Sequence, residues 1–217
     1  AVVGDFDPST VKPMIERYFG TLEKRERPVT PGVSTRVVTE ERRVQVDEPV
    51  QLPKIAMAWL TPAAFQPGDG ECDLLATILG AGRSSRLYQK LVYEAKIAHD
   101  VSASQESLGL ASIFRVEVTG QPQISLEELE KRTQAVLDQI REEGVTEAEL
   151  QRARNLLLTT MVSSLQQVGG FGGKADLLNR YNHYLANPNY WAEDLERYQK
   201  ATVFDVGNMA KKVLNKE

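Results

Sequence analysis

The sequence is poor in the two residues that most often bind transition metals. Its 217 residues include one cysteine, Cys72, and two histidines, His99 and His183. One cysteine cannot form an internal disulfide and provides no thiolate cluster for a metal. Because Cys72 lies beside Leu74 and Leu75, we interpret it as a buried, unreactive thiol.

The chain also lacks an excess of basic residues and a long apolar run. Its formal net charge is −4, whereas a nucleic-acid groove needs a clustered basic surface. No apolar run approaches the roughly 20 residues that span a bilayer. We therefore expect no nucleic-acid partner and no membrane span. A hydrophobic content of 41% and a charged content of 26% instead fit a globular protein.

Common catalytic motifs are missing as well. The sequence contains no HxxEH zinc motif, no GxSxG nucleophile turn and no glycine loop ending in GK[ST]. A catalytic zinc needs three side-chain ligands and a carboxylate beside its bound water. Since His99 opens a predicted strand and His183 lies in a tyrosine-rich helix, we expect this chain to hold no catalytic residue and no metal site of its own.

The pattern of apolar residues predicts strands first and helices afterwards. Alternation predicts four strands, at 36–49, 54–60, 98–105 and 112–118. Helical spacing predicts helices at 71–79, 125–144, 146–168, 175–185, 190–201 and 203–214. Gly109 favours a hairpin between the last two strands. This order predicts an α+β fold, with an antiparallel sheet and helices packed on one of its faces.

A separate element precedes this sheet. Residues 1–4 read as the end of a strand, and Asp7-Pro8 is a helix start that runs to Gly20. Residues 22–34 combine prolines with many charges and have no apolar periodicity, so we predict a linker there. Because the chain opens on a strand already under way, we expect it to be part of a longer precursor.

The stretch 79–99, LGAGRSSRLYQKLVYEAKIAH, combines the most local signals. Gly80 and Gly82 are expected to take positive φ and to turn the backbone sharply. Ser84 or Ser85 can then accept a hydrogen bond from the first free N–H groups of a helix. Taken alone, these features indicate a turn and a helix start in a small α+β domain.

The helix in this stretch is predicted to be amphipathic. Leu87, Leu91 and Val92 fall on one face. Arg86 and Lys90 are four residues apart and can point towards solvent or towards a ligand. The residues alone leave this choice open.

Four segments of the chain resemble the M16 (pitrilysin-like) zinc peptidase family, in its non-catalytic C-terminal half. LGAGRSSRLYQKL resembles the turn and helix of that half, VTEAELQRARNLLL its long helix, and ATVFDVGNMAKKVL its closing helix. Residues 1–20, AVVGDFDPSTVKPMIERYFG, are similar to the end of the family's N-terminal half. The resemblance covers essentially the whole chain. It implies an M16/LuxS-type metallohydrolase-like roll that occurs twice around a chamber, with the HxxEH zinc site in the first copy.

The resemblance also implies domains and a function. It assigns 1–20 to the end of the preceding M16 N-terminal domain, 21–35 to a linker and 36–217 to the M16 C-terminal, inactive domain. The chain would then be the non-catalytic, substrate-binding and chamber-forming half of a zinc metallopeptidase that cleaves peptides. The alternative is a structural or protein-interaction homologue without proteolytic activity, so whether the chain belongs to an enzyme stays open.

Cofactor and partners follow from the same resemblance. Zinc is expected in the catalytic N-terminal half, a domain or a separate subunit, and no cofactor is expected in this chain. The other expected partner is a peptide substrate. Self-association into a homodimer through residues 1–20 is a further expectation, because an unpaired strand is a template for another chain. A periplasmic and a cytoplasmic bacterial location both stay open.

The resemblance finally points to site residues. In active M16 enzymes an arginine and a tyrosine after SSRL contact the peptide, and Val92 and His99 occupy these positions here. Val92 cannot bind a peptide carbonyl, whereas His99 can. The substrate-binding candidates are therefore His99, Arg86, Ser84 and Ser85. The alternatives are an ordinary strand-entry role for His99 and a capping or ion-pair role for Arg86.

Overall fold

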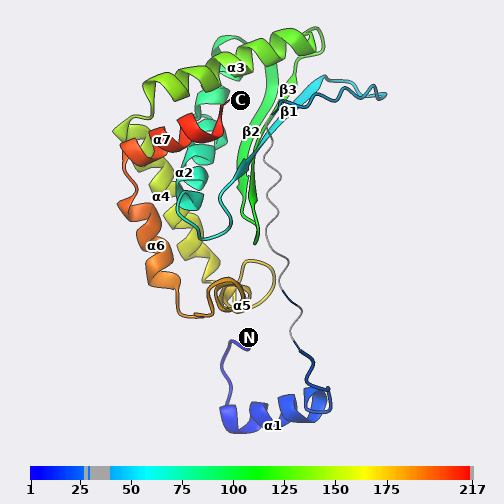
Figure 1. Ribbon diagram of the computed structural model, residues 1–217, viewed down its shortest axis with the longest axis vertical. Coiled ribbons are helices and arrows are strands. Elements are labelled where there is room, and N and C mark those ends of the chain that lie inside the picture. The colour runs from blue at the N-terminus through cyan, green and yellow to red at the C-terminus, as the bar shows by residue number, and fades with distance from the viewer. Residues whose placement is uncertain (27–28, 30–39, 216–217) are drawn as a thin grey trace. The chain divides into compact units, whose positions relative to one another are not determined.

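The computed structural model describes residues 1–26, 29 and 40–215 (Figure 1). The chain divides into two compact units. The first unit, which we call the helical unit, consists of Ala1–Thr35 and Ser163–Pro188. The second unit, which we call the sheet unit, consists of Arg36–Val162 and Asn189–Glu217. Most of the predicted linker, and the first four residues of the strand predicted at 36–49, lie outside the described residues.

The sheet unit is built on a three-stranded antiparallel sheet in the order β1-β3-β2. Its strands are β1 (Lys54–Thr61), β2 (Ala98–Glu106) and β3 (Ser112–Gly120). They confirm three of the four predicted strands, and β2 and β3 form the predicted hairpin.

The fourth predicted strand is wrong over the part of it that the structure describes, residues 40–49, which form no strand. Val44 and Val46 are 87% and 69% exposed, so their alternation with charged residues does not reflect a buried face. Alternation predicts a strand only where one face packs on a core.

The helices of the sheet unit follow the predicted order. They are α2 (Asp69–Gly80), η1 (Tyr88–Glu94), α3 (Leu126–Glu143), α4 (Glu147–Ser164, whose last two residues belong to the helical unit), α6 (Trp191–Lys200) and α7 (Val203–Val213). Figure 1 shows α2, α3 and α7 on one side of the sheet. α2 packs against β2 and α7, and α3 packs against α7, β1 and β3. The predicted α+β fold, with helices on one face of an antiparallel sheet, is confirmed.

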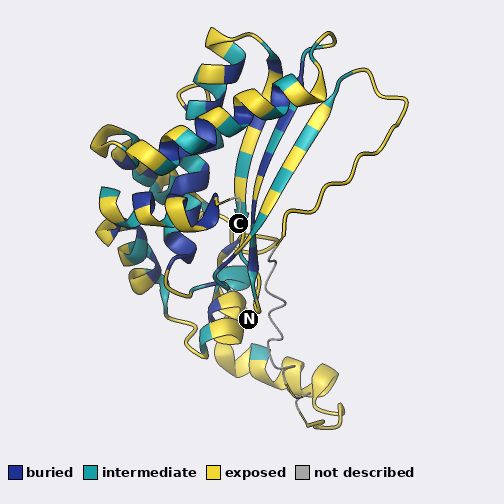
Figure 2. Ribbon diagram, turned by 45° about the horizontal axis from the view of Figure 1, so that its top comes forward, coloured by how far each residue is buried: buried dark blue, intermediate teal, exposed yellow. Residues whose placement is uncertain are grey.

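The core lies between this helical layer and the sheet, where Figure 2 shows the buried residues. β3 contributes Phe114, Val116 and Val118, each 0% exposed, and α2 contributes Leu75 and Ile78, also 0% exposed. Burying one such side chain stabilises the fold by about 1.5–3 kcal/mol. The alternation of buried and exposed residues along β3 therefore fixes which face of the sheet meets the helices.

The other face of the sheet, which we call the open face, carries exposed and half-buried side chains. By register it consists of Lys54, Ala56, Ala58 and Leu60 of β1, Ile113, Arg115, Glu117 and Thr119 of β3, and Asp100, Ser102, Ser104 and Glu106 of β2. Alanine and serine line the middle of the two outer strands, so the open face is flat there. Leu60 is 52% exposed on it.

Gly80 has a different role from the one predicted. It is the last residue of α2, and its φ is not positive, whereas Gly82 has φ +72 as predicted. A Cβ added at Gly80 would lie 2.8 Å from the Cβ of Ala103 and would collide with the Ala103 amide. Glycine is therefore required here because α2 ends directly against β2.

The helical unit contains α1 (Pro8–Phe19) and α5 (Lys174–Leu185). The predicted start of α1 is confirmed, because the Asp7 carboxylate accepts a hydrogen bond from the Ser9 amide at 2.9 Å. Residues 1–4 form no strand in this structure. A strand needs a neighbouring strand, and the described part of this unit contains none. Because the expected neighbour belongs to the preceding domain, the interpretation of residues 1–4 as the end of a strand stays a prediction.

Candidate functional site

The stretch 79–99 forms a turn, a π-helix and the entry into β2. η1 is wound more widely than an α-helix, so the Ala95 amide donates to the Lys90 carbonyl, five residues back, at 3.1 Å. Leu87 and Leu91 are buried as predicted, and Val92 packs partly against the core. π-helical turns are rare and are frequent at functional sites.

The two serines do not cap this helix, so that prediction was wrong. The start of η1 has no side-chain cap in the described chain. Ser85 is fully buried, and its hydroxyl donates to the Gly82 carbonyl at 2.8 Å, which closes the turn before the helix. Ser84 is exposed. Of the two serines, only Ser84 is therefore accessible to a ligand.

Arg86 is held in an ion pair with Glu149 of α4. Its Nε donates to Oε1 at 2.6 Å, and its Nη2 donates to Oε2 at 2.8 Å and to the Gly144 carbonyl at 2.9 Å. The two side chains are 15% and 16% exposed. Arg86 thus connects the start of η1 to the junction of α3 and α4. This is the ion-pair role that the sequence analysis gave as the alternative to substrate binding.

Glu149 serves two partners at once. It forms a capping box with Thr146 at the start of α4, because it accepts a hydrogen bond from the Thr146 amide at 2.8 Å while its own amide donates to the Thr146 hydroxyl at 3.3 Å. Burial alone would raise the pKa of Glu149, but the hydrogen bonds from Arg86 and Thr146 outweigh it and lower the pKa to about 2. The carboxylate is therefore ionised at neutral pH.

His99 lies at a β-bulge where β2 begins. Ala98 pairs with Gly120 and Asp100 pairs with Thr119, so His99 is the extra residue. Ala98 is buried while His99 and Asp100 are both exposed. A bulge directs an additional side chain out of the regular alternation. His99 is thereby presented beside Asp100 at the end of the open face, whereas Arg86 contacts the helical layer.

A group of buried polar residues escaped the sequence analysis. Asp69, 2% exposed, accepts hydrogen bonds from the Phe65 amide at 2.8 Å, Ser107 Oγ at 2.6 Å and Gln105 Nε2 at 3.2 Å. It also accepts from Arg197 Nη1 at 3.3 Å. Asp69 therefore joins α2 to β2 and to α6.

The same arginine contacts a second carboxylate and two rings. Its Nε and Nη2 donate to Asp194 Oδ1 at 3.0 and 2.6 Å. Its guanidinium carbon lies 5.1 Å from the centre of the Phe65 ring and 5.3 Å from that of Tyr198, within cation–π range. The Tyr198 hydroxyl donates to Asp73 Oδ2 at 2.7 Å. The available sequence signal was a pair of acids four residues apart, Asp69 and Asp73, on a helix whose later residues are mostly apolar.

Cys72 is 0% exposed, as its interpretation as a buried thiol requires. Burial, together with nearby carboxylates, raises the pKa of Cys72 to about 12. The thiol is therefore protonated at neutral pH and has no nucleophilic form to offer.

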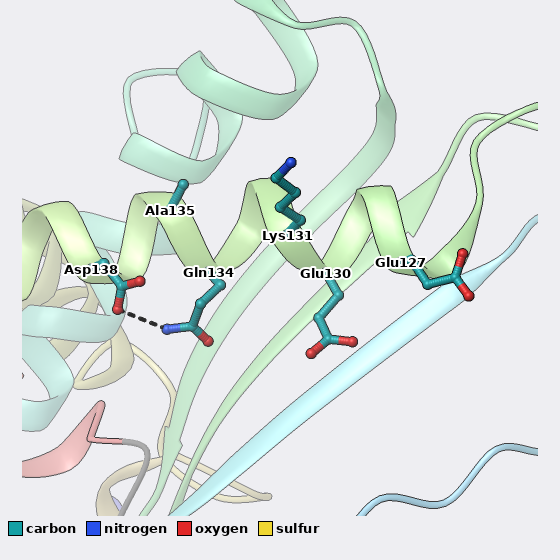
Figure 3. Close-up of a pocket in the computed structure, with 6 residues that line it drawn as sticks. All are labelled: Glu127, Glu130, Lys131, Gln134, Ala135 and Asp138. Carbon is teal, nitrogen blue, oxygen red and sulfur yellow. Dashed lines mark hydrogen bonds between the residues drawn. The ribbon is translucent and has the colours of Figure 1, made fainter.

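A shallow groove runs along α3 (Figure 3). It is lined by Glu127, Glu130, Lys131, Gln134, Ala135 and Asp138. Gln134 Nε2 donates to Asp138 Oδ1 at 3.0 Å, and Arg43 pairs with Glu130. These are solvated groups on one surface helix, so the groove offers a ligand no enclosed site.

The described residues contain no group of three or more His, Cys, Asp or Glu side chains that could hold a metal ion. Among their helices, none is long and apolar enough to cross a membrane.

Comparison with known proteins identifies the family. The model of the peptidase M16 inactive domain matches residues 1–157, and the chain belongs to this family. Zinc protease PqqE of Helicobacter pylori is 25% identical over 182 residues, which are 79% of this chain and 39% of that protein. An uncharacterized zinc protease of Mycobacterium tuberculosis is 23% identical over all of this chain and 49% of its own.

Solved structures share the fold. A protease from Helicobacter pylori has a TM-score of 0.79 at 22% identity, covering 99% of this chain and 51% of that one. A peptidase M16 inactive domain from Pseudomonas fluorescens has a TM-score of 0.72 at 21% identity, covering 98% and 49%. The predicted family is confirmed by the family match, and the chain spans between 39% and 51% of the length of these relatives.

Proposed function

We propose that this chain is the non-catalytic, substrate-binding half of an M16-type zinc metallopeptidase that cleaves peptides. The observation that carries the proposal is the match to the inactive M16 domain in a chain that spans about half of relatives named zinc proteases. In this proposal the HxxEH zinc site belongs to the catalytic N-terminal half. Residues 1–20 close that half, 21–35 are the linker, and 36–217 are the substrate-binding half.

The open face supports a peptide-binding role. Ala58 and Ser104 flank Arg115 in the register of the sheet, so an extended chain can approach the strands closely there. His99 lies at the end of this face and is exposed. A neutral imidazole can accept a hydrogen bond from a peptide N–H or donate one to a carbonyl.

Reconstitution tests the proposed role. The catalytic half and this chain are produced separately, and hydrolysis of a fluorogenic peptide library is measured for each alone and for the mixture. We expect hydrolysis from the mixture, and little from either half alone. Equal activity of the catalytic half with and without this chain would favour the structural or protein-interaction alternative. Hydrolysis by this chain alone would contradict the proposal outright.

Substitution of His99 tests the substrate contact. In the reconstituted enzyme, His99→Ala should raise KM a few-fold to about tenfold, because a lost hydrogen bond costs roughly 0.5–1.5 kcal/mol. Zinc content and the unfolding midpoint should not change. His183→Ala, which replaces an exposed histidine on α5, is the matched control. If kcat/KM of the His99→Ala enzyme equals that of the wild type, His99 is not a substrate contact.

A further inference from the structure

The open face carries three kinds of side chain in a row along β3. Leu60 and Ile113 lie opposite each other in the register of the sheet, and Leu60 is 52% exposed. Arg115 comes two residues further along β3, and Glu117 two residues further again. Side chains two positions apart on a strand share a face and lie about 7 Å from each other. An apolar pair, a cation and an anion therefore follow one another on the open face.

The anion in this row already has a partner. Lys54 Nζ lies 3.1 Å from Glu117 Oε2, so these two charges neutralise each other. Arg115 is exposed, and among the described residues it has no ion pair or hydrogen bond through its side chain. The middle of the open face therefore presents one uncompensated positive charge.

The surroundings of Arg115 leave room for an extended chain. Ala58 of β1 and Ser104 of β2 flank it, and Ala56 and Ser102 are the next residues of these strands on the same face. All four are exposed and short, so a peptide backbone can lie over them while the guanidinium reaches one of its side chains. A guanidinium presents a planar fork of N–H donors that matches a carboxylate.

We propose that the open face selects peptides in which an acidic residue and an apolar residue are two positions apart. This inference rests on the proposed function, because it narrows the class of substrate. An extended peptide that lies along β3 points alternate side chains at the face, with the same spacing of about 7 Å. Its carboxylate pairs with Arg115, and its apolar side chain covers Leu60 and Ile113. The two residues can follow each other in either order, according to the direction in which the peptide runs.

Peptide binding to this chain tests the pattern. Labelled peptides of otherwise identical sequence carry Asp-Ala-Leu, Leu-Ala-Asp, Asn-Ala-Leu, Asp-Ala-Ser or the unspaced Asp-Leu-Ala, and fluorescence anisotropy gives their Kd values. The better of the first two should bind about two- to fivefold more tightly than the Asn peptide, as expected for one exposed ion pair. It should bind about fourfold more tightly than the Ser peptide, which is the value of one buried methylene group. The unspaced peptide should lose one of the two contacts.

Variants separate the two contacts. Arg115→Gln should remove the preference for Asp over Asn and keep the preference for Leu over Ser, whereas Leu60→Ser should do the opposite. Arg115→Lys keeps the charge and should retain part of the preference for Asp. Glu106→Gln, which removes the negative charge opposite Ile113, should increase that preference. Arg152→Gln, at an exposed position of α4, is the matched control and should change neither preference.

The inference and the proposed function can fail separately. In the reconstituted enzyme, kcat/KM for the same peptides should follow the Kd ratios. Hydrolysis of all the peptides at equal kcat/KM would overturn the inference and leave the proposed function standing. A mixture of the two halves that hydrolyses none of them would contradict the proposed function, and the Kd ratios would then decide the inference. Equal Kd values for the Asp and Asn peptides, or a ratio that persists in Arg115→Gln, would overturn it.

Discussion

Two largely buried arginines each join distant parts of the sheet unit, and they differ in the number of carboxylates that they face. Arg86 faces Glu149 and a backbone carbonyl, and its partner has a pKa lowered to about 2. Arg197 lies among several carboxyl groups, and the pKa of Asp73 nearby is raised to about 7. The comparison shows that burial alone does not set the sign of a pKa shift. The balance of charge and hydrogen bonds around the carboxylate decides it.

The largest predicted effect removes Arg197, the guanidinium that pairs with the buried carboxylates of Asp69 and Asp194. Arg197→Met keeps an apolar stem against the Phe65 ring but leaves these carboxylates without this cation. At pH 8 the free energy of unfolding should fall by about 3–5 kcal/mol, the usual cost of breaking a buried pair. At pH 5 the loss should be smaller, because Asp73, whose pKa is raised to about 7, is then protonated and adds no negative charge nearby. Urea unfolding at the two pH values measures this, and equal losses would show that the charge of Asp73 does not act on the pair.

A smaller effect is expected at the Arg86 site, and it disappears at a lower pH than the effect at Arg197. Glu149→Gln should cost about 1–2 kcal/mol above pH 5, after allowance for solvent screening. The folded pKa of Glu149 lies below its ordinary value of 4.5, so its contribution is present above pH 4.5 and is lost as pH falls towards 2. Wild type and variant should therefore converge in acid, as seen by urea unfolding. Glu147→Gln, at an exposed position of the same helix, is the control; parallel curves at every pH would contradict the assignment.

The smallest effect is expected at an exposed ion pair that sets the scale for the other two. Lys90 and Glu94 lie four residues apart on η1, at 2.8 Å, with 46% and 52% of their side chains exposed. Lys90→Ala should change the free energy of unfolding by no more than about 0.5 kcal/mol, and by less at high salt. Thermal unfolding at low and high salt checks this. A loss of several kcal/mol would mean that the degree of burial does not explain the different stability effects expected at the three sites.

Much of the fold could be predicted from local signals. Asp7 and Thr146 begin helices as their side chains indicate, because a capping residue and its amide are neighbours in sequence. The strand predicted at 36–49 fails over its described part, because alternation does not say whether a core exists to cover the valines. Gly80 was assigned to a turn, because its contact with Ala103 is visible only once α2 meets β2.

The candidate sites divide in the same way. The alternating pattern placed His99 at the start of a strand, and the family resemblance made it a candidate peptide contact. The bulge that exposes it comes from the pairing of β2 with β3, which the alternation did not indicate. Asp69 and Arg197 are separated by 128 positions in the sequence, so no local pattern joins them. An acid between apolar residues, such as Asp73, is the kind of signal that could have prompted a search for a buried partner.

The sheet unit is discontinuous, and this has a consequence for the order of synthesis. Its chain leaves after Val162 and returns at Asn189, so α7 emerges from the ribosome after α2 and α3. Val206 and Ala210 of this helix, both 0% exposed, pack in the core beside α2 and α3. Until they arrive, the nascent chain exposes the apolar surfaces of α2 and α3 that α7 will cover, and these surfaces are open to aggregation or to chaperones. Emergence of α7, rather than formation of the hairpin, is therefore the step that commits this unit to its native structure.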